Sequence, residues 1–146
     1  MITLQFVSDD TLGADLIGWY TRSLYTHVDA IMPGGGLLGA RIKGGVQSRP
    51  PDYRTFTRCA RFTTTLSPEA ENRFYGTLVS QLGKPYDWTG IVGFIADRDW
   101  RDPSHWYCSE LIAWAFEQAG RPLLRIDNLD RVTPRDLTTS LLITPA

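Results

Sequence analysis

Cys108 opens a predicted helix and is the residue best placed for nucleophilic chemistry. It lies in WYCSELIAWAFEQAG (106–120), where apolar residues recur every three or four positions: Leu111, Ile112, Ala115, Phe116 and Ala119. The positive end of a helix dipole favours the thiolate, which is the nucleophilic form, and nearby backbone N–H groups can bind an oxyanion. The simpler alternative is an unreactive cysteine, because free cysteines commonly pack as small hydrophobic side chains.

A cysteine nucleophile needs a base, normally histidine, and a third group that fixes the imidazole tautomer. His27 lies in a predicted strand with Asp29 two positions later, so both side chains leave the same face. His105 lies in a polar loop three residues before Cys108. Each of these residues, taken alone, is more commonly a structural or surface side chain. Their combination with Cys108 is what points to catalysis.

The composition is that of a folded globular protein. The chain has 146 residues, of which 42% are hydrophobic and 21% charged, and a formal net charge of -1. This balance gives no support for a nucleic-acid partner. No apolar run approaches the roughly 20 residues of a membrane span, and no secretory signal is visible. We therefore expect no integral membrane segment, and either a cytoplasmic location or export by a route that the sequence does not display.

The cysteine and histidine counts limit other chemistries. Cys59 and Cys108 are too few for a disulfide scaffold. With two cysteines and two histidines, a zinc site would need carboxylates, and no close ligand spacing supports one. We expect no metal and no cofactor. A redox or disulfide protein that uses Cys59 and Cys108 is one alternative, which a count of free thiols tests.

The elements that position these residues follow from hydrophobic periodicity and turn signals. Strands are predicted at 2–7, 25–31, 37–42, 46–49, 53–65 and 141–144, with a glycine-rich hairpin turn at 33–36. Helices are predicted at 11–22, 67–82, 88–96, 108–119 and 133–139. In the second of these helices the expected inward residues are Phe74, Leu78, Val79 and Leu82. No repeat or linker interrupts the chain, so we expect one α+β domain spanning 1–146.

Two segments resemble the cysteine region of the NlpC-like, papain-like cysteine peptidases. They are the loop GKPYDWTG (83–90) and the Cys-Ser-Glu-Leu sequence that begins at Cys108. In those enzymes the catalytic histidine follows the cysteine, whereas here no histidine follows Cys108 and Tyr25-Thr26-His27-Val28-Asp29 precedes it. This order resembles the circularly permuted, YiiX-like branch of the superfamily, whose distant relatives include lecithin:retinol acyltransferase. The resemblance extends over roughly residues 27–137, most of the chain.

The resemblance implies roles for three residues. Cys108 matches the nucleophile, His27 matches the base, and Tyr86 matches a tyrosine that positions the substrate or stabilises the oxyanion together with the Cys108 backbone N–H. It also implies an α+β, papain-like fold, in which an antiparallel sheet or small barrel packs on the helix that carries Cys108.

The third polar residue has two candidates. Relatives often place it in the strand after the histidine strand, where this chain offers Gly39 and Arg41. Asp29 is favoured slightly, because a carboxylate stabilises imidazolium better than an amide does. Gln47, in the next segment, is the alternative.

These residues and the resemblance together predict a cysteine hydrolase of the amidase and peptidase kind, or of the thioesterase and acyltransferase kind. It would work through an acyl-enzyme on Cys108 with His27 as the base. The substrate classes that the resemblance suggests are a cell-wall peptide and a lipid-linked acyl group, so the expected partner is a small peptide, amide or acyl-lipid. The alternative is a catalytically silent binding or assembly module on the same fold, which would keep the cleft but lack a reactive thiolate.

Overall fold

The computed structural model describes residues 1–8, 23–87, 105–125, 129 and 132–146. Within them the protein has an α+β fold, a six-stranded antiparallel sheet in the order β4-β3-β2-β1-β5-β6. The strands are β1 (Ile2–Ser8), β2 (His27–Ile31), β3 (Leu37–Arg41), β4 (Gly45–Arg49), β5 (Arg58–Thr64) and β6 (Thr144–Pro145). The helices are α2 (Pro68–Ser80), α4 (Cys108–Gln118) and α5 (Pro134–Thr138). The predicted fold class is confirmed, with the sheet open rather than closed into a barrel.

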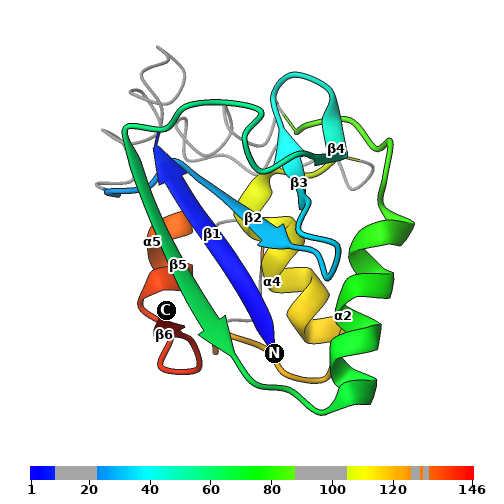
Figure 1. Ribbon diagram of the computed structural model, residues 1–146. Coiled ribbons are helices and arrows are strands. Elements are labelled where there is room, and N and C mark those ends of the chain that lie inside the picture. The colour runs from blue at the N-terminus through cyan, green and yellow to red at the C-terminus, as the bar shows by residue number, and fades with distance from the viewer. Residues whose placement is uncertain (9–22, 88–104, 126–128, 130–131) are drawn as a thin grey trace.

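Helix α4 lies behind the sheet in Figure 1 and packs against β2, β3 and α2. The five apolar residues predicted to face inward from this helix are all buried. Phe116 of α4 meets Phe74 of α2 with ring centroids 4.5 Å apart, which joins the two helices. Helix α4 therefore holds its first residue, Cys108, against the sheet.

The predicted hairpin forms between β2 and β3. The Met32 N–H donates to the Gly36 carbonyl at 2.8 Å, and the Gly35 N–H donates to the Met32 carbonyl at 2.8 Å. In the resulting register Ala30 faces Leu38, both buried in the core. Strand side chains alternate between the two faces. His27 and Asp29 therefore leave the face of β2 opposite to the one that carries Ala30.

The helix caps match their sequence signals. The Ser67 hydroxyl accepts the Ala70 N–H at 3.3 Å and Pro68 begins α2. Thr133 and Asp136 form a capping box at the start of α5. No helix in the described segments combines the length and apolarity needed to cross a bilayer.

Several expectations about local structure are wrong. Val79 and Leu82 are 47% and 45% exposed rather than inward, because the buried stripe of α2 runs along every fourth residue through Phe74 and Leu78, and Leu82 lies beyond the helix end. The strand predicted at 53–65 begins only at Arg58, since a turn after Pro50 occupies its first residues.

The end of the chain also differs from the sequence pattern. The last strand is Thr144–Pro145 rather than 141–144, and Leu141 is 98% exposed. The helices predicted at 11–22 and 88–96 lie outside the described residues.

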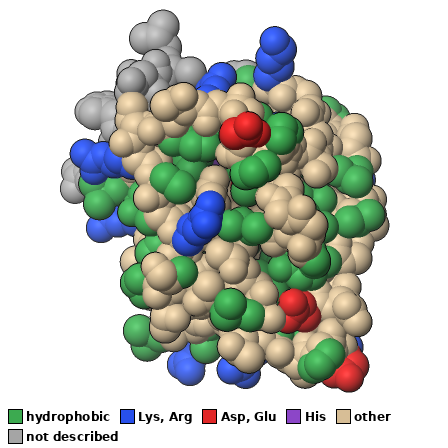
Figure 2. All heavy atoms as spheres, viewed as in Figure 1, with side chains coloured by type: hydrophobic (Ala, Val, Ile, Leu, Met, Phe, Trp, Pro, Cys, Tyr) green, Lys and Arg blue, Asp and Glu red, His purple; other side chains and the backbone are tan. Residues whose placement is uncertain are grey.

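Strand β5 carries two exposed arginines. Arg58 and Arg61 are both exposed, and the Arg61 Nε donates to the buried Gln5 of β1 at 3.2 Å. Figure 2, drawn from the same side as Figure 1, shows Lys and Arg side chains spread over this face and around its edge.

Candidate active site

Strand β2 presents a histidine and a carboxylate that form a buried pair. His27 Nε2 lies 2.8 Å from Asp29 Oδ1, and the side chains of the two residues are 8% and 0% exposed. The pairing follows directly from strand geometry, because residues two apart leave the same face. Because Nε2 faces Asp29, Nδ1 is the ring nitrogen left for a second partner.

That second partner is Cys108, the first residue of α4. The thiol is hydrogen-bonded to the His27 side chain, and its sulfur accepts a hydrogen bond from the backbone N–H of Val28. Tyr107 is the N-cap of α4 and makes no side-chain capping bond. The first N–H groups of a helix have no partner within the helix, so those around Cys108 are suited to a developing oxyanion.

The neighbourhood favours a thiolate beside an imidazolium. Burial by itself raises the pKa of the Cys108 thiol, but the charge of His27, the hydrogen bond with His27 and the Val28 N–H together lower it. Burial by itself lowers the pKa of His27, but the charge of Asp29, the charge of Cys108 and hydrogen bonds with both residues raise it. The two shifts favour the same charge-separated pair, which is the reactive form of a cysteine nucleophile.

Asp29 is surrounded by positive charge. Burial by itself raises the pKa of the Asp29 carboxyl, but His27, then Arg41 and Arg49, hold it below its ordinary value. Arg41 Nη2 lies 3.8 Å from Asp29 Oδ2. Asp29 therefore stays ionised and can hold the imidazole ring while stabilising its protonated form.

Arg49 is a neighbour of Asp29 that was not predicted from the sequence. Its guanidinium is buried and donates to the carbonyls of Gly39 at 3.1 Å, Gln47 at 3.2 Å and Gly45 at 3.1 Å. The sequence carries a signal for it, because alternation along β4 puts Arg49 on the same face as Gln47.

Tyr86 reaches the site through a loop that is tied to the start of α4. Trp106 N–H donates to the Pro85 carbonyl at 3.1 Å, and Asp87 N–H donates to the Trp106 carbonyl at 3.1 Å. Tyr86 is 8% exposed. Its burial, followed by the nearby charge of Cys108, raises the pKa of Tyr86 well above its ordinary value. The phenol therefore keeps its proton and can act as a hydrogen-bond donor.

Gly45 lets this loop approach β4. A β-carbon on Gly45 would lie 2.1 Å from the Lys84 carbonyl oxygen, and its φ of +63° is one that other residues rarely adopt. The Val46 N–H donates to the same Lys84 carbonyl at 2.9 Å. Tyr86 is thus held from both sides, by β4 and by the residue before the α4 cap.

The other candidates lie elsewhere. Gln47 is half-buried and its amide donates to the Gly44 carbonyl at 2.6 Å, whereas the groups that act on the His27 ring are Asp29 and Cys108. Cys59 is exposed on β5 and Cys108 is buried, and both are free thiols. The structure thus contains no Cys59–Cys108 bridge. His105 lies beside Trp106, two residues before the α4 cap.

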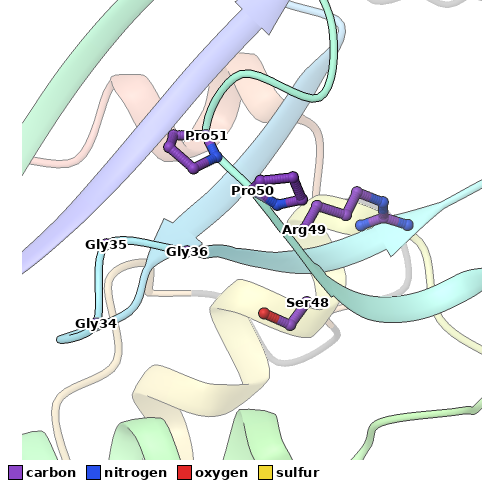
Figure 3. A pocket seen from close by; sticks show the side chains of 7 residues that line it. All are labelled: Gly34, Gly35, Gly36, Ser48, Arg49, Pro50 and Pro51. Atoms are coloured by element: carbon purple, nitrogen blue, oxygen red, sulfur yellow. The ribbon is translucent and has the colours of Figure 1, made fainter.

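A separate shallow hollow of about 480 Å³ opens at the far end of the β2–β3 hairpin. Figure 3 shows its lining, which consists of Gly34, Gly35, Gly36, Ser48, Arg49, Pro50 and Pro51. The Arg49 side chain points away from the three glycines in this view. The lining of the hollow does not include Cys108, His27 or Asp29.

Comparison with known proteins connects this arrangement to one fold. No protein-family model matches the sequence, and no curated protein matches it. Among solved structures, the metalloprotein YiiX from Escherichia coli O157:H7 matches with a TM-score of 0.78 over 99% of this chain and 94% of that chain. The two sequences are 18% identical. The likeness shows that this chain has the same α+β fold as YiiX.

Proposed function

We propose that this protein is a cysteine hydrolase that cleaves amide, ester or thioester bonds through an acyl-enzyme on Cys108. The observation that carries the proposal is the buried series Cys108, His27 and Asp29, in which a thiol, an imidazole and a carboxylate are linked in that order. A nucleophile, its base and an orienting group for the base are the three parts that covalent catalysis by cysteine requires.

The reaction would proceed in two halves. His27 takes the proton of the Cys108 thiol, the sulfur bonds to the substrate carbonyl carbon, and the carbonyl electron pair moves to oxygen. The Cys108 backbone N–H and the Tyr86 hydroxyl stabilise that oxyanion. The oxyanion then collapses, the bond to the leaving group breaks, and the leaving group takes the proton from His27.

The second half regenerates the enzyme. His27 removes a proton from water, the resulting hydroxide attacks the thioester, and the acyl group leaves as a carboxylic acid while Cys108 regains its proton. An amine in place of water would make the protein an acyltransferase. Asp29 holds the imidazole orientation through both halves, because its Oδ1 lies beside Nε2 and leaves Nδ1 for the sulfur.

The substrate classes that we propose are those suggested by the sequence resemblance: a small peptide or other amide, or a lipid-linked acyl group. YiiX is described as a metalloprotein. In the described segments of this chain, no group of three or more His, Cys, Asp or Glu side chains is arranged to hold a metal ion.

An activated acetyl ester, p-nitrophenyl acetate, tests the proposal without knowledge of the natural substrate. Brief reaction followed by acid quenching and intact-mass measurement should show a single acetyl group, and peptide mapping should place it on Cys108. Cys59→Ser should acetylate like the wild type, whereas Cys108→Ala and His27→Ala should not. A folded wild-type protein that forms no adduct on Cys108 would instead support the silent binding module.

A further inference from the structure

Gly39 stands in the middle of β3, a position where glycine is unfavourable. Glycine weakens a strand interior, because it gains little from packing and loses much backbone freedom. Its φ lies outside the left-handed region, so backbone conformation does not demand glycine here. The reason lies in the space beside it.

The carboxylate of Asp29 occupies the volume that a side chain at position 39 would need. A β-carbon built on Gly39 would lie 2.2 Å from Asp29 Oδ1, which is too close for a real contact, and 3.2 Å from Asp29 Cγ, which is tighter than most real contacts. Asp29 Oδ1 is the same atom that meets His27 Nε2 at 2.8 Å. The position of the oxygen that holds the imidazole thus depends on the missing side chain of Gly39.

Two arginines, Arg41 and Arg49, lie beside the space over Gly39. Arg41 Nη2 approaches Asp29 Oδ2 at 3.8 Å, and the Arg41 guanidinium lies over the Tyr53 ring at 5.1 Å from its centroid. Arg49 is fixed to the carbonyl of Gly39 itself. The other titratable groups whose charge bears on Asp29 and His27 are Tyr53 and Cys108.

We infer that Gly39 is a positioning residue, and that the space above it is a carboxylate seat that Asp29 fills from the histidine strand. This inference rests on the proposed function of His27 and Cys108 and adds a specific geometric requirement to it. The seat could equally be filled from β3. A carboxyl oxygen of an aspartate lies about 2.4 Å from its own β-carbon, and the β-carbon of a residue at position 39 would lie 2.2 Å from where Asp29 Oδ1 now is.

Exchanging the two residues tests the seat. The variants are Asp29→Ala, Gly39→Ala and the double variant Asp29→Ala/Gly39→Asp. The readouts are the His27 pKa from NMR titration, assigned with His105→Ala because the chain has two histidines, and the rate of Cys108 alkylation by iodoacetamide near neutral pH. Neither readout needs a substrate, and circular dichroism reports folding.

Both single variants should lower the His27 pKa, Asp29→Ala by removing the carboxylate and Gly39→Ala by pushing it aside. The double variant should restore the His27 pKa toward the wild-type value and alkylate at least about tenfold faster than Asp29→Ala. Its matched control is Asp29→Ala/Gly36→Asp, which has the same net charge but places the carboxylate at the hairpin turn, where a β-carbon would contact Ser48 instead. In this control the His27 pKa and the alkylation rate should stay at the values of Asp29→Ala.

The inference is wrong if a folded double variant has the same His27 pKa and alkylation rate as Asp29→Ala. It is also wrong if Asp29→Ala/Gly36→Asp regains both values as fully as the double variant, since a general charge effect would then explain the recovery. Should the double variant not fold, Gly39→Ala decides the question, because an unchanged His27 pKa in that variant also overturns the seat. The proposed function can fail separately. If the double variant regains the wild-type His27 pKa but the wild-type protein never forms an acyl-enzyme, the role of Gly39 stands and the hydrolase proposal is wrong. If the wild-type protein forms an acyl-enzyme but the double variant does not regain the His27 pKa, only the role of Gly39 is wrong.

Discussion

Replacing His27 with alanine removes the positive charge beside the Cys108 thiol, and the thiol should then lose its reactivity near neutral pH. In the wild type the His27 charge is the largest of the effects that lower the pKa of Cys108 against its burial. Without that charge, burial of a thiol that is 4% exposed dominates. The pKa of Cys108 in the variant should therefore return to its ordinary value or rise above it.

The size of the effect follows from the thiolate population. An ordinary thiol has a pKa of about 8.5, so at about pH 6.5 no more than about 1% of it is thiolate. Each pKa unit by which the wild-type thiol lies below that value multiplies its thiolate population about tenfold, until the thiol is fully ionised. We therefore expect His27→Ala to slow alkylation of Cys108 by at least about tenfold at this pH.

The assay is the ultraviolet absorbance of the thiolate during a pH titration, combined with iodoacetamide alkylation kinetics. A Cys59→Ser background makes Cys108 the reporting thiol, since the chain has two cysteines. His105→Ala is the matched control and should titrate like the background protein. The absorbance step of Cys108 should move to higher pH in His27→Ala.

Two results would show that His27 is not the group that activates Cys108. If a folded His27→Ala protein titrates and alkylates like its parent, His27 does not stabilise the thiolate. If His105→Ala loses the fast reaction while His27→Ala keeps it, the base is His105, and the assignment of the permuted order is wrong.

Two further changes test the orientation of His27 and the packing of α4. Asp29→Asn should lower the His27 pKa measured by NMR, whereas Gln47→Leu should leave it unchanged. Because the pKa of Asp29 is lowered in the folded protein, the Asp29 carboxylate stabilises the fold above its ordinary pKa of about 3.9, and this stabilisation is lost as pH falls through the folded-state pKa. The free energy of unfolding of Asp29→Asn, measured in urea, should therefore depend less on pH in the acid range than that of the wild type. Phe116→Ala should lower the free energy of unfolding by about 3–5 kcal/mol in urea titrations, whereas the 98% exposed Leu141 should tolerate alanine within about 0.5 kcal/mol.

Local pattern was enough to predict the elements that carry the candidate site. The apolar spacing after Cys108 gave α4 and its buried face, and the period of two along a strand put His27 beside Asp29. Both relations involve residues within a few positions of each other, which is the range over which backbone geometry alone fixes direction.

The features that the sequence did not predict depend on neighbouring strands. That Gly39 leaves space for Asp29, and that Arg49 reaches the carbonyls around it, follows from the register of β2, β3 and β4. Register is set by the whole sheet and not by any one segment. The wrong inward assignment of Val79 has a related cause, because the face of α2 that is buried is decided by where α4 lies.

Competition between the two cysteines for a limiting alkylating agent shows whether Cys108 is held as a reactive thiolate. One equivalent of iodoacetamide at about pH 6, where an ordinary thiol is almost fully protonated, is followed by peptide mapping of the label. We expect the label on Cys108, although this residue is 4% exposed and Cys59 is exposed on β5. Labelling of Cys59 first, with Cys108 reacting only after denaturation, would contradict it.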